Sequence, residues 1–300
     1  MKRLLTITFL LFVTVGQSQT SGQLLKRAFK KKSTDLLEQF FQEWHQENQP
    51  ISKIELSKLN DTIKQTYLVF TKFYKPLNID SLGGSEWGND IYKNTKFLII
   101  QNFIKIYFTD KLYYTEQEVD NYVVNYINRN IKDDSTRQKL LRRTEGKLSK
   151  SVLEHFGPNQ NVFFERNDTL IDSIINFRPQ IECSGKQPLY LNKKYNEILN
   201  AFLGNKHLPL GTGGIMNPAR SKGQSKKRKK FLEKYIKIWY GHWGGYWQLI
   251  SYPKAYAVTF DKEMKYARID FRMVYEGGEA ILKRENDKWI LISSKRTWIE

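Results

Sequence analysis

Cysteine is nearly absent from this chain, and its absence removes one way of holding a fold together. Cys183 is the only cysteine among 300 residues, so no disulfide can form within the chain and its stability must come from packing. A solitary thiol is more often a small buried apolar group than a nucleophile. We therefore expect Cys183 to have no redox role.

Histidine is also scarce. The chain has His45, His155, His207 and His242, and none is spaced from another in the way that zinc ligands are. The glycine-bearing segment 211–220 lacks both the glycine spacing and the following Lys-Ser/Thr of a phosphate-binding loop. We expect no metal and no other cofactor. We interpret the segment as a surface or lid loop, with Arg220 as a candidate ligand contact.

The apolar run at the start of the chain is too short to anchor the protein in a membrane. It covers residues 4–15, follows Lys2 and Arg3, and precedes Gly16-Gln17-Ser18, whereas a spanning helix needs about 20 residues. A basic start, a short apolar run and small residues at the cut are typical of an export signal. We predict cleavage near Ser18 and a mature protein in the periplasm or outside the cell.

Acidic residues are outnumbered by basic ones. The chain has 49 Lys and Arg against 31 Asp and Glu, a net charge of +18; without Lys2 and Arg3 this becomes +16. Such a charge favours anionic partners. Because export makes nucleic acid an unexpected partner, a plain solvated basic surface and docking on anionic envelope polymers are the interpretations that remain. The basic segments 26–32, expected to be a mobile leader, and 226–230 would form such a surface; the oligomeric state is left open.

Residues 19–179 are predicted to be mainly helical, with a small sheet. An apolar stripe at 36–44 indicates one helix. A capping box at Ser52 and Glu55 opens a predicted five-turn helix that ends before Pro76. Strands are expected within 96–108, and helices over 115–131 and 135–156. A hairpin is expected over 162–175 around Asn167-Asp168. We place a domain change near Pro179.

Residues 180–300 are predicted to form helices followed by a curved, five-stranded antiparallel sheet, which makes the fold class α+β. One short helix spans 195–203, and another begins in the basic segment. The expected strands are 246–252, 255–260, 266–275, 279–285 and 288–298. The third alternates an apolar set with a charged set, so one of its faces should pack on helices. Gly277-Gly278 is interpreted as a bulged connection.

The end of the chain resembles a known fold family. Ala267-Arg268-Ile269-Asp270-Phe271-Arg272, Gly277-Gly278-Glu279-Ala280 and Lys288-Trp289-Ile290-Leu291 form a charged strand, a glycine turn and a Trp-bearing last strand. This order resembles the second half of the nuclear transport factor 2-like (cystatin-like) cone fold, and the likeness covers about the last 120 residues. It implies a cone-like sheet and no particular activity, because cone folds host enzymes and non-enzymes. The whole chain also resembles secreted proteins of Bacteroidota, a resemblance that implies no particular activity.

Two groups of residues are candidates for a ligand site. The first is the aromatic and glycine-rich segment 239–247, from which Tyr240, His242 and Trp243 are predicted to face a ligand and Trp247 the core. Alternatively, the large aromatic side chains of this segment pack into the core at the end of a helix. The second lies on the charged strand and comprises Arg268, Asp270, Arg272 and Glu276. Glu276 joins the others only if the glycines do not shift the register.

These candidates support three hypotheses of function. The first is an exported, non-enzymatic module that binds a small anionic or aromatic-stacking ligand. The second is a hydrolase that pairs His242 with Asp270 or Glu276; pairing His242 with Cys183 is a weaker version, because Glu182 opposes thiolate formation. The third is a basic surface protein that docks on anionic envelope polymers.

Overall fold

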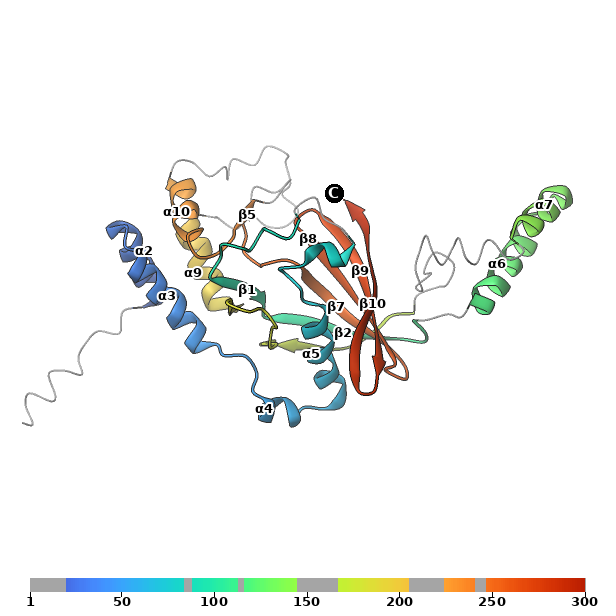
Figure 1. The fold of residues 1–300 in the computed structure, drawn as a ribbon, viewed down its shortest axis with the longest axis horizontal. Helices are drawn as coiled ribbons and strands as arrows, with labels where there is room; N and C mark the ends of the chain where they lie inside the picture. Colours follow the sequence, from blue (N-terminus) through green and yellow to red (C-terminus); the bar gives the residue numbers. More distant parts are fainter. Residues whose placement is uncertain are drawn as a thin grey trace, which may run out of the picture.

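The structure is a computed structural model that describes residues 20–83, 88–112, 116–144, 167–204, 224–240 and 247–299. The fold is α+β, as the sequence predicts. Helices dominate the N-terminal part, and an open six-stranded mixed sheet occupies the centre of the body (Figure 1). The cone-like shape stays a prediction. Among the described helices, none has the length and hydrophobicity needed to cross a bilayer.

The basic leader is a helix, which corrects the prediction of a mobile segment. Helix α2 (Ser21–Lys31) starts with a reciprocal capping box between Thr20 and Gln23, which satisfies two backbone N–H groups at the helix start. Its apolar residues Leu24, Leu25 and Ala28 are buried. They pack beside α3 (Thr34–Glu47), the helix expected from the apolar stripe at 36–44. The lysines of α2 are left on the outer side.

The predicted five-turn helix is two helices. Ser52 and Glu55 form the expected capping box, but it opens only the short α4 (Lys53–Ser57). The side chain of Asn60 then accepts a hydrogen bond from the backbone N–H of Ile63 at 2.8 Å and caps α5 (Asp61–Phe73). Asparagine is a strong N-cap residue, so it starts a new helix inside what the apolar spacing alone makes continuous.

Strand β1 (Phe97–Gln101) separates two hydrophobic cores. It pairs in parallel with β4 (Gln187–Leu191), and all five of its residues are buried. Phe97 and Ile99 belong to a core with α2 and α3, whereas Leu98 and Ile100 belong to the core between α5 and the large sheet. The first core is completed by α9 (Lys193–Leu203), which ends at Gly204 as predicted, and by α10 (Gln224–Leu232). Helix α10 contains the basic segment 226–230, in which a helix was predicted to begin, and it ends at Leu232.

The large sheet has the strand order β10-β9-β8-β7-β2-β3. Its members are β2 (Phe103–Thr109), β3 (Thr169–Ile175), β7 (Lys254–Asp261), β8 (Tyr266–Met273), β9 (Glu276–Glu285) and β10 (Lys288–Ile299). The last four form the predicted antiparallel meander, and β2 joins it by parallel pairing with β7. The sheet therefore takes strands from both sides of the predicted division at residue 179.

Two of the predicted strands pair differently from the prediction. Within 246–252, only β6 (Trp247–Gln248) is a strand, and it pairs with β5 (Trp239–Tyr240) outside the large sheet. Ser251 instead exchanges hydrogen bonds with the backbone of Ile99. Strand β3 pairs with β2, while residues 162–165, its predicted hairpin partner, lie outside the described residues.

Helices α6 (Glu116–Asn130) and α7 (Asp134–Thr144) pack on each other. Figure 1 shows them projecting from the body beyond β10. They correspond to the two helices predicted over 115–131 and 135–156, of which residues 145–156 lie outside the described part.

Gly277 and Gly278 lie inside strand β9 and do not form the predicted connection between strands. The chain turns at Val274 and Tyr275 instead. A side chain at Gly277 would collide with the indole of Trp298, and one at Gly278 would collide with the backbone of Lys295. The register irregularity lies opposite, on β10 between Arg296 and Trp298. The glycines are needed because β10 and its Trp298 approach so closely.

We expect Gly277→Ala to lower the free energy of unfolding by about 1–3 kcal/mol, the usual cost of overpacking a filled site. Gly22→Ala is the matched control, because a side chain there meets only Ile198 at 3.8 Å and alanine favours the helix by up to about 1 kcal/mol. Urea unfolding of both variants measures the difference. Equal stability of the two variants would contradict the role given to Trp298.

Candidate functional site

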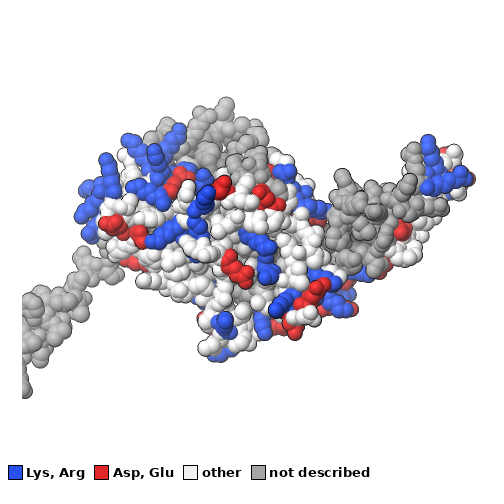
Figure 2. All heavy atoms as spheres, viewed as in Figure 1, with Lys and Arg blue, Asp and Glu red and all other residues white. Residues whose placement is uncertain are grey.

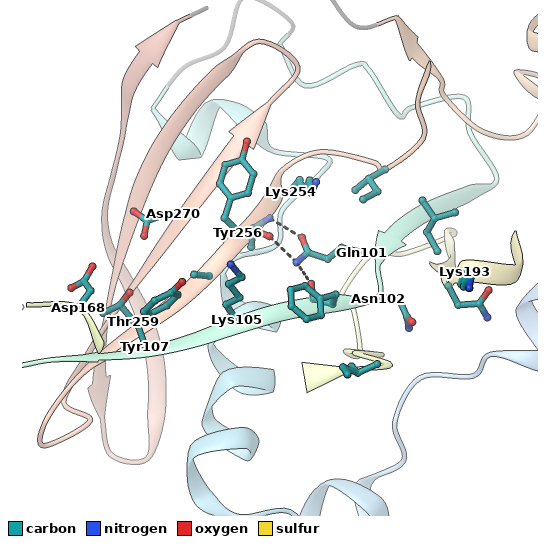
Figure 3. A pocket seen from close by; sticks show the side chains of 17 residues that line it. Gln101, Asn102, Lys105, Tyr107, Asp168, Lys193, Lys254, Tyr256, Thr259 and Asp270 are labelled. Carbon is teal, nitrogen blue, oxygen red and sulfur yellow. Dashed lines mark hydrogen bonds between the residues drawn. The ribbon is translucent and has the colours of Figure 1, made fainter. Parts of the chain in front are cut away.

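A pocket of about 780 Å³ lies on the polar face of the large sheet. Strands β2, β7 and β8 form its floor, and residues that follow β4 close one end (Figure 3). Its volume falls within the range of small-molecule sites. The lining residues are Gln101, Asn102, Phe103, Lys105, Tyr107, Asp168, Ile175, Leu191, Asn192, Lys193, Ile250, Lys254, Ala255, Tyr256, Ala257, Thr259 and Asp270.

The buried side chain of Gln101 fixes the corner where β1 turns into β2. Its amide nitrogen donates to the carbonyl groups of Ala255 at 2.8 Å and Phe103 at 2.9 Å, and its amide oxygen accepts from the N–H of Ala255 at 2.8 Å (Figure 3). The side chain thus does for Ala255 what a neighbouring strand would do. The start of β7 is held against β2, and the pocket floor is set.

The register of the strands places the polar side chains in rows across the pocket floor. Arg272 of β8 lies opposite Lys254 of β7. Further along β7, Ala257 lies between Lys105 and Asp270, and Thr259 between Tyr107 and Arg268. Residues directly opposite in a sheet share a face. The row at Lys254 therefore holds two cations, the row at Ala257 holds a cation and a carboxylate, and the row at Thr259 holds two hydroxyl groups beside Arg268.

Lys254 stands at the junction of this pocket with a smaller cavity of about 310 Å³, which Arg272 and Trp247 also line. Within the described part of the chain its ammonium makes no ion pair with a carboxylate, and it lies 5.7 Å from the centroid of the Tyr256 ring. Burial, and then the positive charge of Arg272, lower the pKa of Lys254 from its ordinary value. Two like charges therefore face each other across the strands.

Arg268 lies beneath the other end of the pocket and orders the groups above it. Its side chain is only 1% exposed. Nη2 donates to Asp168 and to the hydroxyl of Thr259, and Nε donates to Asp270 at 3.3 Å. Removing one partner from a buried ion pair typically costs 3–5 kcal/mol, so this cluster holds Asp270 and Thr259 firmly.

The charged-strand candidates are brought together only in part. Arg268, Asp270 and Arg272 share the polar face, as the alternation predicts, while Ala267, Ile269, Phe271 and Met273 are buried on the other. Glu276 lies opposite Met273 and forms an ion pair with Arg296 at 3.0 Å. It therefore lies on the apolar side of the sheet, away from the pocket.

The aromatic segment is described only at its ends. Arg220, His242 and Trp243 lie outside the described residues, and of Tyr240 only the backbone, in β5, is described. Trp247 is 7% exposed and belongs to the core with α2 and α3, as expected. The hydrolase pairing of His242 with a carboxylate therefore remains a hypothesis.

The thiol of Cys183 is partly buried among the apolar residues beneath the sheet. Burial raises the pKa of this thiol to about 11; the charge of Lys186 lowers it and that of Glu182 raises it, but burial is the largest effect. The thiol is therefore protonated at neutral pH, which disfavours the thiol-hydrolase hypothesis. Among the described residues, no group of three His, Cys, Asp or Glu side chains is arranged to hold a metal ion.

Several pocket residues were missed at the level of the sequence. Lys105 and Tyr107 alternate with the buried Ile104 and Ile106 along β2, which is a signal that one face of this strand is polar. Asp168 had been assigned to a turn. The position of Lys254 carries no local signal, because its importance comes from Arg272 on the next strand.

Comparison of the chain with protein-family models, with curated sequences and with solved structures found no match in any of the three. The pocket itself is therefore the basis for assigning a function.

We expect Lys254→Met to raise the free energy of unfolding by about 0.2–1 kcal/mol at pH 7, because like charges directly opposite in a sheet are destabilising. Below the lowered pKa of Lys254 the ammonium is charged in the folded and unfolded states, and the cost is present in full. As the pH rises towards the ordinary value of 10.5, the folded state loses this proton first and the cost disappears. Unfolding in urea at several pH values tests this, with exposed Lys288→Met as control. A loss of stability at pH 7 would contradict it.

Proposed function

We propose that this protein is an exported, non-enzymatic binding module that holds a small organic anion in the pocket at Lys254. The observation that carries the proposal is that Lys254 on β7 lies directly opposite Arg272 on β8. In the described part of the chain, Lys254 forms no ion pair with a carboxylate. An anion bound between two facing cations relieves their repulsion and replaces the water that burial removes from the ammonium.

The surroundings of Lys254 support an organic ligand over a bare inorganic ion. Tyr256 is 40% exposed and lines both cavities together with Leu191 and Ile250. An exposed aromatic ring beside aliphatic side chains offers an apolar surface to the body of a ligand. Export is supported by the pattern of residues 1–18, which lie outside the described residues.

A thermal-shift measurement with cyclohexanecarboxylate as the probe tests this proposal. The acid should raise the melting temperature of the wild-type protein in a concentration-dependent way, because a ligand that binds only the native state stabilises it. Lys254→Met should lower the apparent affinity for the acid at least about tenfold, which corresponds to about 1.4 kcal/mol of binding free energy. Lys288→Met should bind as the wild type does.

Cyclohexylmethanol, which has the same ring without the charge, is the matched neutral probe and should give no shift. If the acid fails to bind, or binds equally well to Lys254→Met, the pocket is not an anion site.

A second candidate function rests on a different surface. Figure 2 shows Lys and Arg side chains gathered over the end of the molecule that carries α2 and α10. Phe29 of α2 and Phe231 of α10 are in ring contact at 5.5 Å, and the guanidinium of Arg228 lies 5.9 Å from the ring of Phe29. The two basic segments are therefore neighbours, and neither 21–32 nor 224–232 contains an acidic residue. This basic face fits docking on an anionic envelope polymer.

Retention on immobilised dextran sulfate tests the basic face. A variant with four exposed lysines of the face changed to Gln should elute at clearly lower salt than wild type, because binding by exposed charges is screened by salt. The four positions are Lys26, Lys30, Lys227 and Lys230. A control with the same loss of charge elsewhere should elute near the wild type; its positions are Lys53, Lys58, Lys93 and Lys288. Equal shifts in both variants, or binding to phosphatidylglycerol vesicles but not to the polymer, would contradict the proposal.

A further inference from the structure

The proposed anion site occupies only one end of the pocket. Strand β7 contributes floor residues from Lys254 to Thr259, and a strand rises about 3.3 Å per residue, so the floor runs for roughly 15 Å. This is longer than a single sugar ring or a small carboxylic acid. A ligand that fills the pocket must extend well beyond Lys254.

The middle of the floor has a small residue between two charged ones. Ala257 lies directly between Lys105 on β2 and Asp270 on β8. The Lys105 ammonium is a hydrogen-bond donor and makes no ion pair within the described part of the chain, while the Asp270 carboxylate is an acceptor that is 35% exposed. A flat group lying on Ala257 is thus offered a donor on one side and an acceptor on the other.

The far end of the pocket carries hydroxyl groups and an aromatic ring. The side chain of Tyr107 lines the pocket (Figure 3), and its hydroxyl makes no hydrogen bond to the described part of the chain. Thr259 and Asp270 beside it are held in place by the buried Arg268. Tyr256 and Phe103 line the pocket towards the Lys254 end, so aromatic rings stand on both sides of the Ala257 floor.

This combination matches the chemistry of a carbohydrate. Sugar hydroxyl groups both donate and accept hydrogen bonds, and the faces of sugar rings pack against aromatic side chains. A pocket lined by mixed donors and acceptors and by aromatic side chains, with Lys254 at one end where the smaller cavity adds Arg272, fits a sugar that also bears a negative charge. Its length fits more than one ring.

We infer that the ligand is an acidic oligosaccharide of two or more sugar units, with a carboxylate at Lys254 and Arg272 and a second ring on Ala257 beside Tyr107. This inference rests on the proposed function, because the anion end is the site described above. It adds the class of ligand and assigns Ala257 and Tyr107 as residues that determine specificity.

Calorimetry with monosaccharide and disaccharide uronic acids tests the inference. The probes are the gluco, galacto and manno uronates, each as the single sugar and as the disaccharide, with cellobiose as the neutral control. At least one disaccharide should bind the wild-type protein at least about tenfold more tightly than its own monosaccharide, and cellobiose should not bind. A trisaccharide of the same acid distinguishes two sources of the ligand. The protein should bind it more tightly than the disaccharide if the natural ligand is the end of a polymer, and equally tightly if the ligand is a free disaccharide.

Two variants locate the second ring. Ala257→Leu fills the floor without changing charge, and Tyr107→Phe removes only the hydroxyl group. Both should bring the disaccharide affinity close to that of the monosaccharide; Tyr126→Phe, at an exposed position on α6, should alter neither affinity. Melting curves confirm that each variant is folded.

The outcomes separate the two proposals. If monosaccharides and disaccharides bind equally, or if neither variant affects the disaccharide, the oligosaccharide inference is wrong and the anion site stands. If no uronate binds and cyclohexanecarboxylate also fails, the anion site itself is wrong.

Discussion

The burial of β1 on both faces is the constraint on which the rest of this structure depends. Alternate side chains of a strand point to opposite sides, so four consecutive apolar residues in a strand require a core on each side. Phe97 and Ile99 meet the helices α2 and α3, and Leu98 and Ile100 meet the core beneath the large sheet. Both backbone edges are also used, since β4 pairs along one edge and Ser251 binds Ile99 on the other. Helices and sheet are thereby joined through one five-residue strand.

The pocket follows from the way in which β1 ends. Gln101 is the first polar side chain after four apolar ones, and it binds the backbone of Ala255 instead of a solvent molecule. The chain then changes sheet, and β2 runs parallel to β7. That pairing brings Lys105 and Tyr107 from the first half of the chain beside Asp270 and Arg268 from its end. The rows at Ala257 and Thr259 thus depend on contacts between segments about 150 residues apart in the sequence, like the contact of Gln101 with Ala255.

Local signals predicted the local parts of this fold. The alternation along β8 predicted which of its faces is buried. The apolar stripe at 36–44 predicted α3, and Gly204 predicted the end of α9. Sequence spacing failed where one side chain overrides a periodic pattern, as Asn60 does by capping α5, or where polar residues conceal a buried stripe, as the lysines of α2 do. It also failed for the site, because Lys254 becomes distinctive only when Arg272 is placed opposite. Parallel pairing of β2 with β7 has no sequence signature that a short window contains.

The polar face of the sheet holds features that oppose stability. Arg268 is buried with one guanidinium nitrogen lacking a hydrogen-bond partner in the described part of the chain, and Lys254 faces a like charge. Each costs free energy, and the two apolar cores on either side of β1 offset these costs. A sheet face built only for solubility would place a carboxylate beside Lys254, as Glu279 stands beside Lys295 at 3.3 Å on the same face. The contrast between Lys254, which has no ion pair in the described part of the chain, and Lys295 is the physical reason for assigning binding to the end at Lys254 and a structural role to the end at Lys295.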